Sequence, residues 1–555
     1  MSGKQQSQTS KKQVKGTLDI KLPQKESDIW LLFLTIGIIV VSMIRFQLLK
    51  IPLERDEGEY AYMGKLILEG VPPYVKAYNM KLPGTYYMYA LLMSIFGKTN
   101  TGIHTGLIVI NACTMFLFYY AIKNVFNKRI AFVTALGYGL MAAGPYTLGF
   151  AAHATHFVNF FAALGLLFIA RHKSSGKWYY ILLSGLMMGM SFLMKQQAVF
   201  FILFGATVLL FNLPKEKGLV GKVVNTGGIF AAGVFAPYIL NLLILIALGA
   251  FDKFWFWTYE YASKYAAGGS LSNGLAIYMS FFPPIFNEYF IIWLGAIAGI
   301  VIVVINKAYT RSQKIFAIGF GLFSYATVFP GLYFRQHYFI TLLPAIGLLA
   351  GIAFDVMSNW LTGRFKSGLL KYIPVILIII SVSNAIAKNK TYYVNPDVNQ
   401  ICNAAYNGNP FIEAIAIGKF IKSTTKEGDK IAILGSEPEI FLYADRQSAT
   451  GYIYTYGMVE KQPYNLKMQE EMISEIEQEK PVMLMCAYVN YSWLQQAGTP
   501  DSIFRWFADY SAKNYNVVGM VDMLPQGTNY YWNQDAIGVK PQAQNFIVLF
   551  KRKEG

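Results

Sequence analysis

The chain is organised around the sequence ERDEGEYAY at residues 54–62, which follows the first long apolar segment of the protein. Four carboxylates and one arginine fall within six residues here, although only 14% of the residues in the chain are charged. Charge gathered directly beside an apolar segment is a functional candidate by default. This stretch is therefore the first place to look for a site at the edge of a membrane.

The apolar residues on either side of this stretch indicate a membrane protein. The chain has 555 residues, of which 54% are hydrophobic and 16% aromatic, and the apolar ones form many runs of about 17 to 25 residues. A soluble core gives shorter amphipathic stripes, and an outer-membrane barrel gives alternating residues. We therefore expect an α-helical protein that crosses the membrane many times.

The positive charges indicate how the chain is oriented. The formal net charge is +17, but most lysines and arginines lie in short clusters between apolar runs, as cytoplasmic loops do. These clusters predict about eleven spans, with the N-terminus in the cytoplasm and the C-terminus outside it. They disfavour nucleic acid as a partner, and we expect membrane lipids to be the partner instead.

Three regions follow from these patterns. Residues 1–28 form a basic cytoplasmic tail, and residues 29–390 form a transmembrane domain whose first outer loop, residues 50–100, contains two short interfacial helices. Residues 395–555 have the composition of a water-soluble domain, with alternating strands and helices that predict an extracytoplasmic α/β fold. Cys402 and Cys486 fall in this domain; we expect two unpaired thiols, with a disulfide as the alternative.

Asp56 and Glu57 are the candidate catalytic acids of the charged stretch. A carboxylate just above the bilayer can take a proton from a hydroxyl group, and only one of two adjacent carboxylates readily points into a given pocket. The alternative is structural, since acids at the start of a helix cap it and stabilise its positive end.

Cations near other predicted outer turns are candidates for binding a phosphate. Lys195 lies between two apolar runs where the topology gives no reason for positive charge, although a lysine that reaches up to lipid headgroups would look the same. Arg335 and His337 form a second cationic feature that suits phosphate oxygens, or else a simple interfacial pair.

Two further features are weaker. His153 and His156 have the spacing of metal ligands but no nearby third ligand, so we expect hydrogen bonds to substrate or to the acidic loop. No metal or other cofactor is expected, although a divalent metal is not excluded. Glu260 is a candidate substrate ligand in an aromatic outer loop, whose Trp255, Trp257, Tyr259 and Tyr261 fit an interfacial belt better than a sugar-stacking site.

Several stretches together resemble the C-type (GT-C) membrane glycosyltransferases. The resemblance is to the branch that contains protein O-mannosyltransferases and the aminoarabinose transferase of lipid A. It covers about residues 29 to 390 and rests on RDEGEYAY at 55–62, ILEG at 67–70, PPY at 72–74, KLPGTYY at 81–87, GLMMGMSFLMKQQ at 185–197 and RQHYFITLLPAIGLL at 335–349.

The resemblance implies the GT-C fold and an inverting transfer of sugar from a polyprenyl-phosphate donor to a hydroxyl group of a lipid, glycan or protein. It implies that Asp56 is the base and that Lys195 contacts the donor phosphate. Arg55, Tyr60 and Lys81 lie in the matching stretches, and we expect them to bind substrate. The chain departs from the pattern where many members carry a second outer acid, because His156 or a neighbour stands there. We expect the enzyme in the plasma membrane.

Two other classes of function are weighed against this one. A transporter or lipid flippase predicts charges near mid-bilayer and two related halves, whereas the strong charges here lie at the ends of spans. A non-catalytic membrane binding protein, whose work is done by the C-terminal domain, remains an alternative.

Overall fold

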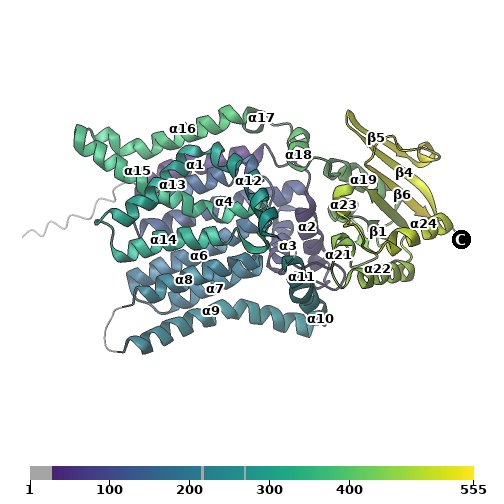
Figure 1. Ribbon diagram of the computed structural model, residues 1–555, viewed down its shortest axis with the longest axis horizontal. Helices are drawn as coiled ribbons and strands as arrows, with labels where there is room; N and C mark the ends of the chain where they lie inside the picture. Colours follow the sequence, from purple (N-terminus) through teal and green to yellow (C-terminus); the bar gives the residue numbers. More distant parts are fainter. Residues whose placement is uncertain (1–27, 214–217, 268–269, 555) are drawn as a thin grey trace, which may run out of the picture.

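The computed structural model describes residues 28–213, 218–267 and 270–554. A long bundle of helices and a smaller domain with a sheet lie end to end (Figure 1), which confirms the predicted fold class. The predicted basic tail, residues 1–28, lies outside the described residues except for Asp28, whose side chain caps the first helix at the amide of Leu31.

The bundle agrees in outline with the expected spans. Six helices in the described ranges are long and apolar enough to cross a membrane, and α12 (Leu271–Glu288) with α13 could make a seventh, although the pair is bent by 99°. The bundle helices are α1 (Ile29–Phe46), α4 (Asn100–Lys123), α5 (Lys128–Met141), α6 (Ala154–Ser175), α7 (Tyr179–Met194), α8 (Val199–Phe211), α9 (Leu219–Ala247), α13 (Phe290–Ile305), α14 (Arg311–Ala326), α15 (Leu343–Phe365) and α16 (Ile373–Lys388).

Burial separates the central helices from those at the lipid boundary. In their most apolar segments, 72% of the residues of α6 and 67% of those of α15 are buried, against 22% for the segment that contains α16. Large apolar side chains of α9 and α13 are exposed, among them Val224, Leu243 and Ile305. Such exposure suits contact with lipid chains, which solvate apolar groups as well as a protein core does.

The segment between α1 and α4 forms the two short helices expected near the interface. They are α2 (Arg55–Leu68) and α3 (Gly84–Phe96), and they lie at the end of the bundle that faces the C-terminal domain (Figure 1). The aromatic loop after α9 is also helical at this end, with α10 (Phe251–Trp255), a π-helical turn (Phe256–Tyr261) and α11 (Ala262–Ala267).

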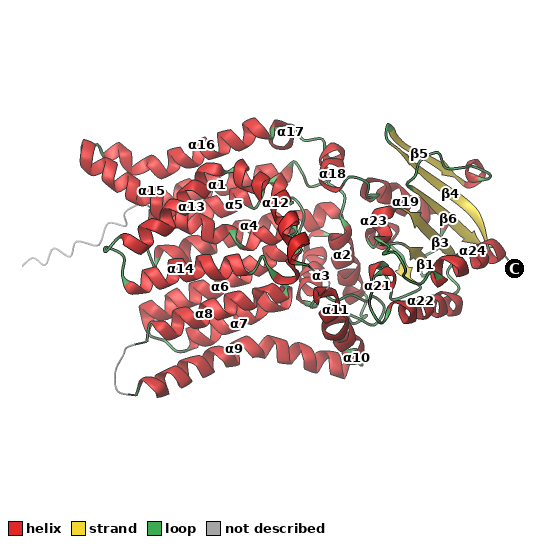
Figure 2. Ribbon diagram, viewed as in Figure 1, coloured by secondary structure: helices red, strands yellow, loops and turns green. Residues whose placement is uncertain are grey.

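The C-terminal domain contains a six-stranded sheet in the order β2-β1-β3-β6-β4-β5, seen at one end of Figure 2. Strands β1 (Lys430–Leu434), β2 (Gln447–Ser448) and β3 (Met483–Tyr488) are parallel, whereas β6 (Phe546–Arg552), β4 (Tyr515–Leu524) and β5 (Gly527–Trp532) pair antiparallel. The β4–β5 hairpin was not predicted from the sequence.

Helices connect these strands and join the domain to the bundle. They are α17 (Lys390–Tyr393), α18 (Val398–Tyr406), α19 (Phe411–Thr424), α20 (Glu439–Ala444), α21 (Tyr456–Val459), α22 (Asn465–Glu479), α23 (Asn490–Trp493) and α24 (Ser502–Asn514). Cys402 and Cys486 are buried and unpaired, as expected.

Candidate active site

A cavity of about 900 Å³ lies where the helical bundle meets the C-terminal domain. Asp56, Lys81, Lys195 and Arg335 line it from the bundle side. Tyrosines of the C-terminal domain line the opposite side. The acid and the cation that the sequence places far apart, at positions 56 and 195, therefore face one shared space.

Asp56 is available for chemistry because a neighbour caps the helix. Glu54 is the N-cap residue of α2, and its Oε1 accepts a hydrogen bond of 3.0 Å from the amide of Glu57. Asp56 lies in the first turn of α2, where the helix dipole favours a negative charge. The structure thus divides the two roles that the sequence left open: Glu54 is the cap and Asp56 faces the cavity.

Two donors hold one oxygen of the Asp56 carboxylate. Lys81 Nζ lies 2.7 Å from Oδ1, and the hydroxyl of Tyr454 donates to the same oxygen at 3.0 Å. No hydrogen bond reaches Oδ2 from the residues that the structure describes, and the Asp56 side chain keeps 27% of its exposure. A carboxylate held through one oxygen presents the other to an incoming hydroxyl group.

Lys81 also keeps Asp56 ionised. Burial raises the pKa of Asp56, but the charge and the hydrogen bond of Lys81 outweigh burial and hold this pKa well below its usual range. Lys81 binds Glu59 Oε2 at 2.5 Å as well, and the Tyr86 hydroxyl donates to Glu59 Oε1 at 2.6 Å. Burial raises the pKa of Glu59 to about 7 although Lys81 opposes the shift. Asp56 is therefore the more fully ionised of the two carboxyl groups at neutral pH.

Close packing between α3 and α7 positions Lys195. A side chain at Gly84 would meet the backbone of Leu193 at 2.5 Å, so the start of α3 can approach the end of α7 only with glycine at this position. Beside it, the Thr85 hydroxyl donates to the carbonyl of Met194 at 2.9 Å. The segment that carries Lys81 thereby also fixes the backbone next to Lys195.

Lys195 points over the ring of Tyr338, with its Nζ 3.9 Å from the ring centroid. Among the described residues it forms no ion pair, in contrast to Lys81. Burial lowers the pKa of Lys195 to about 7, and the charge of Asp56 partly opposes this effect. A cation with an aromatic partner and no carboxylate partner is free to bind an anionic ligand.

Arg335 and His337 both line the cavity, but they differ in character. Arg335 is exposed and lies 6.0 Å from the Tyr333 ring. His337 is buried and stacks on His153, with 4.0 Å between the ring centroids. Burial lowers the pKa of His153 to about 4 and places the pKa of His337 well below its usual value. Both imidazoles are therefore neutral at physiological pH, and Arg335 carries the charge of this segment.

One group of described residues has the geometry to hold a metal ion. Donor atoms of Asp56, His153 and His337 lie within 4.8 Å of one another, and neutral imidazole is the form that binds metals. The sequence paired His153 with His156 instead. His156 lies buried within α6, away from the cavity, and its ring nitrogens have no hydrogen-bond partner among the described residues.

Two further candidates from the sequence lie outside the cavity. Glu57 is buried; its Oε1 accepts the amide of Ala152 at 2.6 Å and lies 3.0 Å from His104 Nε2. These contacts tie α2 to α4 and to the turn before α6. Glu260 is exposed in the π-helical turn and does not line the cavity.

The other expected substrate residues border the cavity in different ways. Tyr60 lines it, with the Lys81 ammonium 4.7 Å from its ring centroid. Arg55 borders it, but its guanidinium turns to the C-terminal domain and lies 3.4 Å from Glu437. Trp257, Tyr259 and Tyr261 also line the cavity, whereas Trp255 is exposed outside it. The aromatic loop therefore contributes to the site, contrary to the belt that the sequence favoured.

The sequence analysis did not predict that residues of the C-terminal domain line the cavity. The main lining residues from this domain are Tyr452, Tyr454, Tyr456, Met458 and Tyr491. Three of these belong to the sequence GYIYTYG at residues 451–457. The alternating tyrosines between two glycines could have drawn attention to this stretch. The pattern alone does not predict that these tyrosines face a membrane helix.

Comparisons with known proteins agree with this architecture. Residues 80–240 match the family model described as dolichyl-phosphate-mannose-protein mannosyltransferase. No curated protein sequence matches the chain at a significant level.

Solved structures share the fold at low sequence identity. The crystal structure of ArnT from Cupriavidus metallidurans bound to undecaprenyl phosphate is 13% identical, with a TM-score of 0.59, and the match covers 94% of this chain and 98% of ArnT. Its apo state is 14% identical, with a TM-score of 0.57, over 94% and 97% of the two chains. An Archaeoglobus fulgidus oligosaccharyltransferase, tethered to an acceptor peptide, is 11% identical, with a TM-score of 0.52, over 92% and 74%.

Proposed function

We propose that this chain is a GT-C membrane glycosyltransferase, a proposal that the family match and the shared fold support. We further propose that it transfers a sugar from a polyprenyl-phosphate donor to a hydroxyl group with inversion at the anomeric carbon. The observation that carries the proposal is the shared cavity, in which an ionised carboxylate with one open oxygen faces two cations that have no carboxylate partner among the described residues. That combination fits attack by a hydroxyl group and departure of a phosphate.

The proposed step assigns one role to each group. Asp56 Oδ2 accepts the proton of the acceptor hydroxyl while its oxygen attacks the anomeric carbon. The bond between that carbon and the phosphate oxygen breaks, and the polyprenyl phosphate leaves with the bonding electrons. Lys195 and Arg335 stabilise the negative charge on the departing phosphate. Lys81 holds Asp56 in its ionised form.

Relatives support a lipid donor but leave the sugar open. The ArnT structure contains undecaprenyl phosphate, and the matching family is described by dolichyl-phosphate mannose. We propose a polyprenyl phosphate of the same kind here and a lipid, glycan or protein as acceptor. The distribution of lysine and arginine supports an orientation with the cavity and the C-terminal domain outside the cytoplasm, and we propose the plasma membrane as the location.

The shared cavity favours transfer over the two rival functions. A binding protein that works through its C-terminal domain alone has no use for Asp56, Lys81 and Lys195 on the bundle side of the same space. A flippase would need charges along a path through the bilayer, whereas these charges gather at one end of the bundle.

Reconstituted protein tests the proposal. The purified protein in lipid nanodiscs is incubated with undecaprenyl-phosphate mannose, glucose or aminoarabinose and with a lipid and glycan extract of the native host. We expect release of undecaprenyl phosphate together with a new glycosylated product, both measured by mass spectrometry. Intact donors throughout, in a folded protein whose co-purified lipids contain no polyprenyl phosphate, would refute the proposal.

We also propose that the transfer needs no metal ion. Lys81 already compensates the charge of Asp56, and Lys195 with Arg335 serves the phosphate. Treatment with EDTA should therefore change the rate of undecaprenyl phosphate release by less than about twofold, whereas loss of one required electrostatic group costs about 10²-fold. A rate that collapses with EDTA and returns with one divalent metal would assign Asp56, His153 and His337 as ligands instead.

A further inference from the structure

Among the residues that the structure describes, one hydroxyl group of the C-terminal domain, that of Tyr454, donates a hydrogen bond to the carboxylate of Asp56. Tyr454 belongs to the loop between β2 and α21, and its O–H donates to Asp56 Oδ1 at 3.0 Å. The Tyr454 ring also lies 5.4 Å from the ammonium of Lys81. The two domains therefore meet at the base itself, and a residue nearly 400 positions away completes its surroundings.

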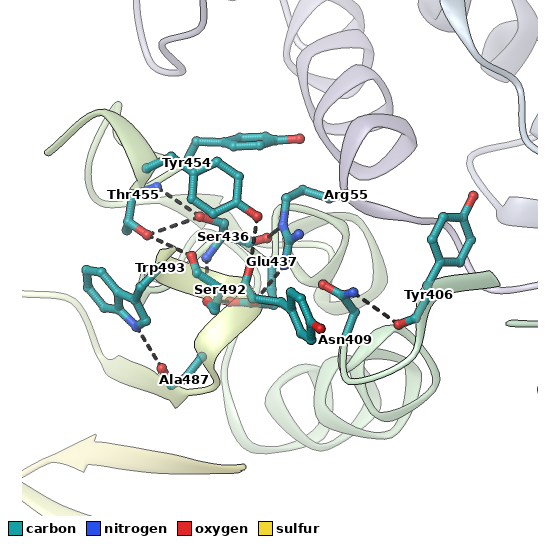
Figure 3. Close-up of polar contacts among 12 residues, drawn as sticks. Arg55, Tyr406, Asn409, Ser436, Glu437, Tyr454, Thr455, Ala487, Ser492 and Trp493 are labelled. Carbon is teal, nitrogen blue, oxygen red and sulfur yellow. Dashed lines mark hydrogen bonds and ion pairs between the residues drawn. The ribbon is translucent and has the colours of Figure 1, made fainter. Parts of the chain in front are cut away.

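A buried network holds the loop that carries Tyr454. The amide of Thr455 donates to Ser436 Oγ at 3.0 Å, and the Thr455 hydroxyl donates to the carbonyl of Ser492 at 3.1 Å. The Ser492 hydroxyl donates in turn to Glu437 Oε2 at 2.9 Å. Figure 3 shows this chain of contacts beside Tyr454. The residues of the network are almost fully buried, and their hydrogen bonds hold the backbone next to Tyr454.

The same network also binds Arg55, the residue next to Asp56. Arg55 Nε donates to the carbonyl of Ser436 at 2.5 Å, and its guanidinium lies 3.4 Å from Glu437 Oε1 (Figure 3). The Arg55 guanidinium also lies 5.3 Å from the ring centroid of Tyr456. Asp56 is thus fixed twice by the C-terminal domain, through its own carboxylate and through the side chain before it.

We propose that Tyr454 is a positioning residue for the base, and that the C-terminal domain is in this way part of the active site. Because Tyr454 and Lys81 both bind Oδ1, they set the rotation of the carboxylate and turn Oδ2 to the cavity. The effect of Tyr454 on catalysis rests on the proposed function, but the contact between Tyr454 and Asp56 can be tested without a transfer assay.

Removal of the Tyr454 hydroxyl should make Asp56 easier to protonate. A hydrogen bond to the ionised form of an acid lowers its pKa, and loss of a bond to a charged group shifts the pKa by about one unit. At a fixed pH far above that pKa, the protonated fraction then rises about tenfold. Carbodiimides react with the protonated carboxyl group, so their reaction with Asp56 reports that fraction.

The experiment compares Tyr454→Phe with Tyr443→Phe in the full-length protein. The Tyr443 hydroxyl also comes from the C-terminal domain and accepts the amide of Leu53 near the start of α2, but it does not line the cavity. Carbodiimide labelling at pH 5 is followed by mass spectrometry that resolves Asp56 from its acidic neighbours. We expect labelling of Asp56 to rise about tenfold in Tyr454→Phe and to stay at the wild-type level in Tyr443→Phe, with thermal unfolding recorded for both.

Thr455→Val provides a second variant that leaves Tyr454 in place. It removes the hydroxyl that anchors the loop, so labelling of Asp56 should rise in the same direction but by less. In a transfer assay, Tyr454→Phe should lower kcat about tenfold and leave the donor KM unchanged. Unchanged labelling in Tyr454→Phe would overturn the positioning role. Raised labelling in a protein that transfers no sugar would preserve the contact and refute the proposed function instead.

Discussion

The two walls of the cavity carry different chemistry. The bundle wall is charged and contains Asp56, Lys81, Lys195 and Arg335, whereas the residues that line the cavity from position 405 onward carry no charge. Charges on the bundle wall sit on helix ends and tight turns that packing holds in place. The neutral wall presents ring faces and hydroxyl groups of tyrosines, which suit an uncharged acceptor such as a sugar. Under the proposed function, we expect the bundle wall to carry out the reaction and the wall from the C-terminal domain to receive the acceptor.

The largest effect should follow from Asp56→Asn, which tests whether the charged wall does the chemistry. The amide keeps the size of the carboxylate but cannot accept a proton, so kcat should fall about 10³-fold with little change in donor binding. Release of undecaprenyl phosphate from the donor measures the rate. Asp252→Asn, on α10 and outside the cavity, is the matched control. Near-normal turnover in Asp56→Asn would remove this residue from the mechanism.

Lys195→Gln should have the next largest effect. It removes a charge that has no carboxylate partner among the described residues, so kcat/KM for the donor should fall about 10²-fold. The control is Lys390→Gln, an exposed lysine in α17. Lipid binding followed by native mass spectrometry should show weaker retention of undecaprenyl phosphate only in Lys195→Gln. Equal retention in both variants would indicate that Lys195 merely reaches lipid headgroups.

The pH dependence of donor binding is a further test of whether Lys195 binds the donor phosphate. Burial lowers the pKa of Lys195 to about 7, so the side chain is charged below pH 7 and loses its charge above it. The donor KM should therefore rise about tenfold between pH 6 and pH 8. Lys195→Arg should flatten this profile because arginine stays protonated throughout that range. A flat profile in the wild type would place the binding charge elsewhere, with Arg335 as the next candidate.

Glu57→Gln should have the smallest effect on catalysis. It distinguishes residues that face the cavity from residues that hold the charged wall in place. Glu57 accepts the Ala152 amide and lies beside His104, so the change should lower the free energy of unfolding by about 1–3 kcal/mol. The kcat per folded molecule should remain within about threefold of the wild type. Thermal unfolding in detergent measures the first quantity. A selective loss of kcat without loss of stability would return Glu57 to the catalytic residues.

Local patterns predicted much of the fold. Long apolar runs required helices that cross a membrane, and three strands of the C-terminal domain were visible as short apolar segments. The β4–β5 hairpin was missed because Tyr515–Leu524 mixes polar and apolar residues without strict alternation. Its partner β5 exposes much of its surface.

The candidate site was predicted only in part, for a physical reason. Asp56 and Lys195 could be identified because unexpected charge beside an apolar segment is costly. Glu57 and His156 are equally polar, yet the sequence could not reveal that their side chains turn into the protein rather than into the cavity. A one-residue step along a helix rotates a side chain by about 100°, so the packing of α2 decided between Asp56 and Glu57.

The sequence by itself determined that this chain spans a membrane, that it carries an acid and cations at the ends of its spans, and that a separate α/β domain follows, because hydropathy and charge act locally. Only the tertiary structure decided which acid caps α2, which histidines stack, and that Tyr454 reaches Asp56. Those outcomes depend on contacts between segments far apart in the chain, such as the 398 positions that separate Asp56 from Tyr454, and close packing rather than local preference selects them.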